Sequence, residues 1–391
     1  MKRGVATGLG VVAVVIGALL VVLAVAAIWI PGPLQELGIA VYGSYGPWVV
    51  IIGALMFGAG LLVRRLGRTV LGWFGAALAT PALLLGLVVC APQAVVAFSE
   101  GTVPTPANTL GIASTENTAP DRTAVYATLE DGTELQAQLW LPRNDSLDPR
   151  PALIWMHGGG FVGGDPAEDA GWHRELAEAG YPVISVQYRL SPPPRWQEAP
   201  SDVACALSWV REQSRELDID PEQIVLGGSD AGGNLALTVA YGLDQPPAEG
   251  TEAESGIGTS CGDLPEAPAG VIAISPQVDL TVPTKAGDFP WAEFLGGSPQ
   301  EAAEAYAYAS PINRVREDLP RTLLITGQYD PVTTQAVADR FASALRGQRV
   351  DVRHLIYPFG GHDFDAPDTL GEEVRDTVAL NWLEQWFPME I

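Results

Sequence analysis

The chain has 391 residues, with 22 Lys and Arg against 46 Asp and Glu, and a formal net charge of -24. This length accommodates one large domain or two of medium size. The acidic balance argues against a nucleic-acid-binding protein, because binding to phosphates needs a basic surface that releases counterions.

Three long apolar runs open the chain. No charged residue occurs in Val5–Ile30, Leu37–Val63 or Thr69–Ser99. A helix of about 20 apolar residues crosses the hydrocarbon core of a bilayer, so these runs predict three transmembrane helices in a membrane region over residues 1–99. A cleavable signal peptide is the competing interpretation of the first run, and its length and the two runs that follow disfavour it. A buried helical bundle in a soluble domain is the remaining alternative.

The basic residues near these runs predict their orientation. The loop between the first and second runs carries Glu36 and neither Lys nor Arg. Basic residues precede the first run and fill the gap between the second and third: Lys2, Arg3, Arg64, Arg65 and Arg68. Since Lys and Arg are enriched in cytoplasmic loops, we expect a multi-pass protein of the cell membrane with a cytoplasmic N-terminus. Everything after Ser99 is then on the extracellular or periplasmic side.

The rest of the chain alternates between strand and helix patterns. Residues 100–120 are rich in Thr, Pro, Ala and Asn and predict a linker, and 121–391 form a second domain. A hairpin is expected around Asp131-Gly132. Short, β-branched apolar runs predict buried parallel strands in PALIWMH, YPVISVQYRL, QIVLGGS, GVIAISP, RTLLITG and VDVRHLIYP.

Helices are expected between these strands, at Ser201–Arg215, Ala231–Gly242, Thr334–Leu345 and Thr369–Trp386. Repeated strand–helix units predict an α/β fold with a mostly parallel central sheet and helices on both faces, preceded by the α-helical transmembrane region. A stretch rich in Pro, Gly, Glu and Ser near 244–268 predicts a surface insertion.

Two of the three cysteines, Cys205 and Cys261, lie in the second domain, where a disulfide could persist. Two cysteines at arbitrary spacing leave open whether they are bonded. No metal-ligand spacing is present, so neither a metal nor another cofactor is expected.

Two glycine-rich turns follow predicted strands. The first is HGGGF, His157–Phe161, in which three glycines let backbone N–H groups point into a site, as an oxyanion hole requires. A flexible turn is the alternative. The second is GSDAGGN, between a strand and a helix, which is the setting of a nucleophile elbow. Gly228 and Gly232 flank its centre because side chains there would clash, so the turn presents Asp230 and points Ser229 away.

Two further polar residues follow strands later in the chain. Asp330 lies just past one strand end, and His362 lies in the glycine-rich loop after the last strand. Each alone is weak evidence, since a loop Asp is usually a turn or cap residue. Together with the elbow they follow the chain order nucleophile, acid, base of α/β-hydrolases.

With these motifs the second domain resembles the hormone-sensitive-lipase-like branch of the α/β-hydrolase fold, a family of carboxylesterases and lipases. The resemblance covers Thr123–Trp386. Besides HGGGF it rests on YRLSP (188–192) followed by Asp202, ISPQVDL (274–280), ASPINR (309–314) and Asp330-Pro331.

The resemblance implies roles for particular residues. Backbone N–H groups of Gly158, Gly159 and Ala231 would form the oxyanion hole, with His157 and Gly160 supporting the motif. His362 would be the general base and Asp330 would orient it. The segment 281–305 falls where the family places part of its lid, and the expected acyl pocket consists of Phe161, Phe289, Trp291 and Phe294. Ordinary core packing is the alternative for these side chains.

The chain departs from the family at the elbow, where G-D-S-A-G-G is usual and this chain has G-S-D-A-G-G. Asp230 therefore stands in the position of the nucleophilic serine. Three interpretations follow: an esterase whose serine has been replaced, a hydrolase with Asp230 as nucleophile, or a catalytically inactive domain that binds a ligand or a membrane-protein partner. Attack by a carboxylate on an ester gives a high-energy anhydride, which disfavours the second. The expected substrate is a carboxylic ester, with acyl lipids of the envelope suggested by the membrane anchor.

Overall fold

The computed structural model describes residues 2–29, 32–67, 69–105, 118–144, 148–243, 256–285 and 287–389. By the contacts within it, the chain falls into two units. Unit 1 contains Met1–Ser114, Gly327–Pro331 and Ile356–Thr377. Unit 2 contains Thr115–Thr326, Val332–Leu355 and Val378–Ile391. The two short segments of unit 1 therefore group with the N-terminal helices, whereas the sequence assigned them to the second domain. The predicted linker lies largely outside the described residues.

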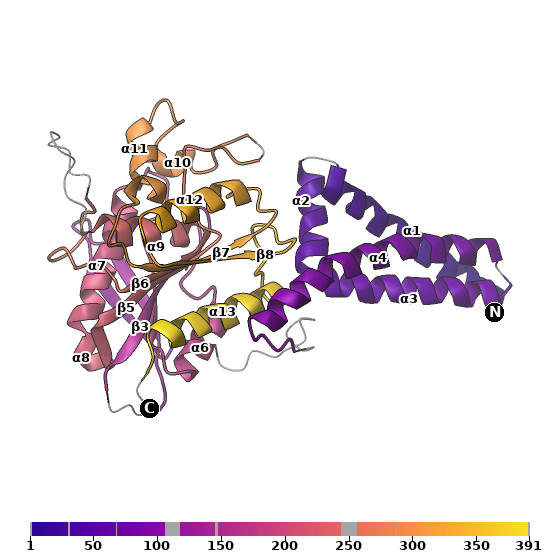
Figure 1. The fold of residues 1–391 in the computed structure, drawn as a ribbon, viewed down its shortest axis with the longest axis horizontal. Coiled ribbons are helices and arrows are strands. Elements are labelled where there is room, and N and C mark those ends of the chain that lie inside the picture. The colour runs from indigo at the N-terminus through magenta and orange to yellow at the C-terminus, as the bar shows by residue number, and fades with distance from the viewer. Residues whose placement is uncertain are drawn as a thin grey trace. The chain divides into compact units, whose positions relative to one another are not determined.

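The second domain is built on one eight-stranded sheet, with strand order β1-β2-β4-β3-β5-β6-β7-β8 (Figure 1). β1 pairs with β2, and β2 with β4, in antiparallel fashion, while β4, β3, β5, β6 and β7 pair in parallel. The strands are β1 (Arg122–Thr128), β2 (Glu134–Trp140), β3 (Arg150–Met156), β4 (Val183–Val186), β5 (Ile219–Ser229), β6 (Gly270–Ile274), β7 (Arg321–Gly327) and β8 (Val352–Tyr357). The predicted mostly parallel sheet and the hairpin at its edge are confirmed.

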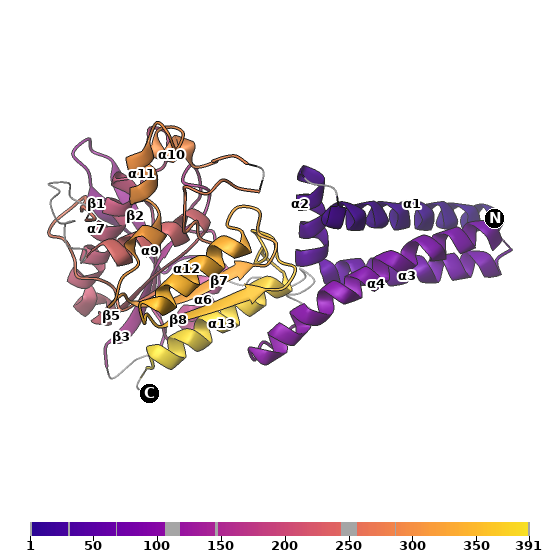
Figure 2. The same ribbon diagram turned by 45° about the horizontal axis from the view of Figure 1, so that its top comes forward.

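Helices cover both faces of this sheet, because its central strands are apolar on both sides (Figure 2). On β3, Ile154 belongs to the large core cluster that also includes residues of α7 (Glu198–Glu212), α9 (Asp230–Gly242) and α12 (Gln335–Gly347). The neighbouring Trp155 packs edge-on against Trp172 of α6 (Ala170–Glu178), as the alternation of side chains along a strand requires.

The remaining helices complete the layers. On the α6 side of the sheet, Trp382 of α13 lies close to Gly270 of β6, where an added Cβ would lie 2.9 Å from the Trp382 ring. Short helical segments fill the connections: α8 (Ser214–Leu217), α10 (Ala292–Leu295), α11 (Ala303–Tyr308) and the 3-10 helix η2 (Pro311–Arg314), and the last helix is α13 (Leu370–Trp386). Of the predicted insertion, 244–255 lie outside the described residues, and 256–268 contain no helix or strand.

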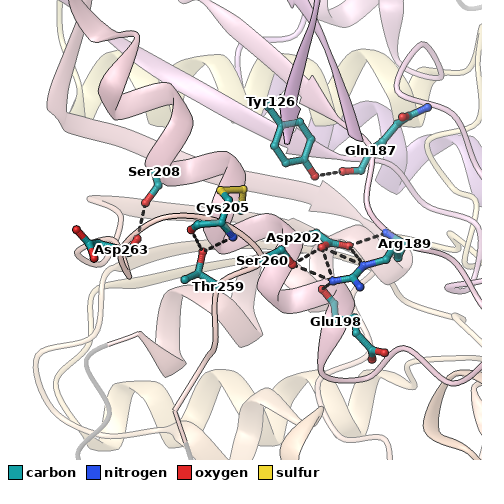
Figure 3. The surroundings of a disulfide bond; sticks show 11 residues. Tyr126, Gln187, Arg189, Glu198, Asp202, Cys205, Ser208, Thr259, Ser260 and Asp263 are labelled. Carbon is teal, nitrogen blue, oxygen red and sulfur yellow. Dashed lines mark hydrogen bonds and ion pairs between the residues drawn. A yellow bond between two sulfur atoms is a disulfide. The ribbon is translucent and has the colours of Figure 1, made fainter. Parts of the chain in front are cut away.

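The insertion is attached to α7 by a disulfide between Cys205 and Cys261, whose Cα atoms are 5.3 Å apart (Figure 3). Next to it the buried Asp202 carboxylate accepts hydrogen bonds from the backbone and guanidinium of Arg189 and from Ser260 Oγ at 2.5 Å. This network explains why YRLSP and Asp202 occur together in the sequence: the carboxylate fixes the chain that leaves β4.

Three long helices occupy the N-terminal region and lie side by side in Figures 1 and 2: α1 (Lys2–Trp29), α3 (Gly46–Arg65) and α4 (Thr69–Ser99). Each contains a segment long and apolar enough to cross a membrane. α3 and α4 approach closely at small residues: a Cβ added to Gly60 would lie 2.5 Å from the Ala76 nitrogen. Such small-residue contacts are typical of packed membrane helices.

The second predicted span differs from the observed helix. The apolar run Leu37–Val63 is divided into the end of α2 (Pro33–Ile39), a π-helical turn η1 (Ala40–Ser44) and α3, which begins at Gly46. Pro47 lies in the first turn of α3, where its missing N–H costs no helical hydrogen bond, so the helix restarts there.

Candidate active site at the strand ends

The turn between β5 and α9 has the geometry of a nucleophile elbow. Asp230 adopts a φ of 50°, a left-handed conformation that is rare and strained for a residue other than glycine. The backbone is too close for side chains at the flanking glycines. An added Cβ would lie 2.4 Å from the Gly232 carbonyl carbon at Gly228, and 2.1 Å from Met156 O at Gly232. The turn therefore presents Asp230, which is partly exposed, at its apex.

The Asp230 carboxylate is held by donors from two neighbouring loops. Its Oδ2 accepts the N–H groups of Gly159, at 3.0 Å, and Gly160, at 2.7 Å. Its Oδ1 accepts a hydrogen bond from Gln277 Nε2. Hydrogen bonds of this kind favour the ionised form of a carboxylate, so the loops stabilise a negative charge beside the elbow.

The glycine loop supplies both backbone donors to Asp230 Oδ2. Gly158, Gly159 and Ala231 stay the predicted oxyanion-hole donors, and of these only Gly159 donates to the carboxylate. Gly158 lies against the elbow, where an added Cβ would be 3.5 Å from Asp230 Cβ, and Ala231 is buried in the first turn of α9. Gly159 and Gly160 have φ values of 100° and 60°, which turn two successive N–H groups toward one point.

His157 and Tyr188 stabilise the glycine loop 157–161 through stacking and a hydrogen bond. The two rings stack with centroids 4.5 Å apart, and Tyr188 donates from its hydroxyl to His157 O at 3.0 Å. Burial lowers the pKa of His157, so the ring is neutral and its Nδ1–H donates to Gly158 O at 2.8 Å. Burial and the Asp230 charge raise the pKa of Tyr188. Sequence reasoning noted YRLSP without giving Tyr188 this role.

Gln277 is the other contact that the sequence did not assign. It belongs to ISPQVDL, and its backbone is fixed by Asn234 of α9, whose Nδ2 donates to Gln277 O at 2.6 Å. The same amide donates to Ala309 O at 2.9 Å, which connects ASPINR to the elbow helix. The motifs were visible in the sequence, but the pairing of Gln277 with Asp230 depends on the tertiary structure.

In unit 1, the structure brings Asp330 and His362 together. Asp330 Oδ2 and His362 Nδ1 are 2.9 Å apart, the carboxylate side chain is fully buried, and the imidazole is 18% exposed. Since the carboxylate accepts at Nδ1, it fixes the tautomer and the orientation of the imidazole ring. The two loops are joined directly, because Tyr329 N donates to Gly360 O at 2.7 Å.

Comparison with known proteins identifies the family of the chain. The family of the alpha/beta hydrolase fold matches residues 153–366. The chain belongs to this family. Among curated proteins it is similar to esterase LipC of Mycobacterium tuberculosis, with 30% identity over 59% of this chain and 57% of LipC. It is also similar to ethyl acetate hydrolase of Pseudomonas putida, with 28% identity over 65% of this chain and 78% of that protein. The chain thus spans little more than half the length of LipC.

Solved structures show the same fold. Apo esterase 2 of Thermogutta terrifontis superposes with a TM-score of 0.57 at 21% sequence identity, over 71% of this chain and 99% of the esterase. The propionate-bound form of that esterase gives a TM-score of 0.56 at 23% identity.

In this α/β-hydrolase, three of the four side chains predicted to line an acyl pocket are core residues. Phe161 and Phe294 are each 1% exposed and stack with centroids 4.0 Å apart. Trp291 is 4% exposed, and its Nε1 donates to Leu280 O. Only Phe289 of the four is partly exposed. The stacked pair packs the residue after the glycines against α10.

Proposed function

We propose that the chain is a membrane-anchored, outward-facing ester-hydrolase-type protein in which Asp230 has replaced the nucleophilic serine. By the chain order of the family, Asp230, Asp330 and His362 occupy the nucleophile, acid and base positions. Gly159 and Gly160 are the oxyanion-hole donors of this proposal. In this chain the Asp230 carboxylate engages those donors, so turnover of carboxylic esters is strongly suppressed and the substrate site is retained.

One observation carries the proposal: the N–H groups of Gly159 and Gly160 converge on Asp230 Oδ2. Donors arranged for an acyl-transfer oxyanion lie within about 3 Å of the point where the negative oxygen forms, next to the elbow side chain. A carboxylate oxygen now takes that point. With a serine at the elbow, the two donors would be free for the carbonyl oxygen of an ester.

Three features support the membrane and outward location. The apolar helices are long enough to span a bilayer, and the flanking Lys and Arg residues follow the bias of cytoplasmic loops. The Cys205–Cys261 disulfide is typical of proteins in oxidising compartments outside the cytoplasm. An anchored domain on that side meets the esters of the envelope, so acyl lipids are the proposed substrate class. Turnover confined to short, water-soluble esters after serine is restored would contradict the lipid assignment.

The test restores the nucleophile in the full chain, purified in detergent. We expect Asp230→Ser to hydrolyse an activated aryl ester and to be labelled by a fluorophosphonate, while the parent chain does neither at a comparable rate. Losing a triad nucleophile costs about 10⁶-fold in turnover, so the gain should be large. Asp230→Ala is the matched control: it frees the donors without supplying a nucleophile and should remain unlabelled.

An inert Asp230→Ser chain with His362 and Asp330 in place would refute the esterase assignment and favour the alternative of a non-catalytic partner in a membrane complex. The Asp-nucleophile alternative has its own test. If Asp230 displaces a leaving group at a saturated carbon, an alkyl ester forms on its carboxylate and the leaving group departs; water then attacks the carboxyl carbon, so turnover in heavy-oxygen water would place the label in Asp230. The hydrogen bonds from Gly159, Gly160 and Gln277 argue against it, since they stabilise the carboxylate and weaken it as a nucleophile.

A further inference from the structure

The loop that carries His362 is in contact with the N-terminal helices, within the same unit. Gln93 of α4 is 1% exposed, and its side-chain Nε2 donates to Pro358 O at 3.1 Å and to Gly43 O at 2.6 Å. Two carbonyl acceptors define the orientation of this amide. Gln93 therefore joins the His362 loop to η1 through a pair of buried hydrogen bonds.

The turn η1 contacts the same loop through its backbone. A Cβ added to Gly43 would lie 2.2 Å from Phe359 O, so the loop approaches closely only because residue 43 is glycine. Ser44 Oγ donates to Asp363 O at 3.4 Å, next to His362. The Phe359 side chain packs against the apolar cluster of the helices that includes Tyr42.

On its other side the loop is held by the segment that carries Asp330. Phe359 N donates to Gln328 Oε1 at 3.0 Å, and Tyr329 N donates to Gly360 O at 2.7 Å. The residues on either side of His362 are thus fixed between the Asp330 segment and the helices. An unpaired buried carbonyl costs about 1–3 kcal/mol, so removing the Gln93 donor would favour movement of this loop.

We propose that Gln93 and Gly43 are positioning residues for His362, and that the helical anchor is thereby part of the catalytic architecture. The anchor then does more than attach the domain to a bilayer: it holds the loop that carries His362, the partner of Asp330. Two features of the anchor fit this role. Gln93 is the only amide side chain in α4, and η1 is a π-helical turn, a geometry that occurs frequently at functional sites. The catalytic part of this inference rests on the proposed function.

The first experiment measures rates in the full chain carrying Asp230→Ser, reconstituted in lipid nanodiscs. Gln93→Leu and Gln93→Glu each remove the amide donors at nearly constant volume, and Gly43→Ala pushes the Phe359 carbonyl away. Because misplacing a catalytic group by about 1 Å can cost about 10²-fold, we expect kcat to fall by about 10- to 100-fold with KM changed less than about twofold.

Two controls separate positioning from general damage to the helices. Ser99→Ala removes an exposed local hydrogen bond at the end of the same helix. Gly58→Ala adds a methyl group in α3 where nothing lies within 4 Å. Both should keep the kcat of the Asp230→Ser chain. Unchanged kcat in an active chain with Gln93→Leu and Gly43→Ala would overturn the proposal.

The second experiment does not depend on activity. Hydrogen–deuterium exchange of the amides in 357–363 is measured in the chain that retains Asp230. Loss of the Gln93 donor should speed this exchange by at least about 10-fold, because the loop opens more readily, and the two controls should leave it unchanged. Unchanged exchange in the Gln93 variants would refute the positioning role. If Asp230→Ser is inert but exchange responds, the proposed function fails while the contact role of Gln93 stands.

Discussion

The elbow around Asp230 and the loop around His362 are held in place by different means. The elbow is fixed by backbone packing: Gly228 and Gly232 leave no room for a Cβ, and the partners of the carboxylate come from the ends of neighbouring strands. The His362 loop is fixed by hydrogen bonds to segments far away in the chain, such as the bond from Gln93, 265 residues from Pro358.

The elbow and the His362 loop should therefore respond differently to substitution. A change in the elbow should damage the fold of the hydrolase domain. A change in the His362 loop or its dyad should damage the chemistry first. The predictions that follow test this separation, beginning with the largest expected effect.

The dyad should control rate far more than stability. In the Asp230→Ser chain, we expect Asp330→Asn to lower kcat by about 10³- to 10⁴-fold, because the amide no longer holds the His362 tautomer. Steady-state hydrolysis of an aryl ester measures the effect. Asp351→Asn, at an exposed carboxylate 3.9 Å from Arg321, is the control and should change kcat little. A loss of less than about tenfold with Asp330→Asn would remove the dyad from the mechanism.

The elbow should control the stability of the fold more than the rate. Gly232→Ala places a methyl group 2.1 Å from Met156 O, a backbone atom that cannot move without disturbing β3. We expect a loss of about 3 kcal/mol in the free energy of unfolding, measured by urea denaturation of the purified chain. Gly163→Ala is the matched control, since nothing lies within 4 Å of its added Cβ. Equal unfolding midpoints for the two variants would show that packing does not fix the elbow.

A second histidine, His354 of β8, is a buried side chain whose effect should be on stability rather than on rate. Its side chain is 3% exposed, its Nε2 and Thr326 Oγ1 form a hydrogen bond of 2.8 Å, and Asp339 Oδ1 lies 3.6 Å from Nδ1. Burial lowers the pKa of His354 to about 4, against the usual raising effect of Asp339. The contribution of neutral His354 to stability is therefore complete above the pKa of histidine in the unfolded chain, about 6.5. It is lost as the pH falls toward about 4, the pKa in the folded chain.

Between pH 7 and pH 5 this contribution should fall by about 2 kcal/mol, because the unfolded chain gains a proton that the folded chain does not. Urea unfolding at both pH values measures the loss. His354→Gln removes the titrating group, so the difference between the two pH values should shrink by about that amount. An identical pH dependence in the variant and the parent would show that His354 is not the group responsible.

The smallest effect is expected next to the Cys205–Cys261 disulfide. Ser260→Ala removes one hydrogen bond to the buried Asp202 carboxylate and should cost about 1.5 kcal/mol of unfolding free energy. Ser208→Ala removes an exposed hydrogen bond to Asp263 O in the same region and should cost less than about 0.5 kcal/mol. Both side chains are visible in Figure 3. Thermal unfolding that ranks the two variants in the opposite order would contradict the importance of the buried network.

Features that depend on local sterics and periodicity were predictable from the amino-acid sequence. β-branched apolar runs correctly predicted buried strands. The glycines around Asp230 correctly predicted the elbow, because a side chain at Gly228 would clash with the backbone of Gly232, a residue close in sequence. The pairing of Asp330 with His362 was anticipated from chain order. Three long apolar runs likewise predicted three long helices, although Pro47 moved the start of the second.

Which groups complete these motifs depends on contacts between residues far apart in the sequence. The backbone donors to Asp230 are Gly159 and Gly160, because two positive φ values set the direction of their N–H groups. Phe161 and Phe294 became a stacked core pair, since burial depends on what packs against a side chain. Gln277, Tyr188 and Gln93 have their roles through contacts with residues distant in sequence, and no local pattern specifies such contacts.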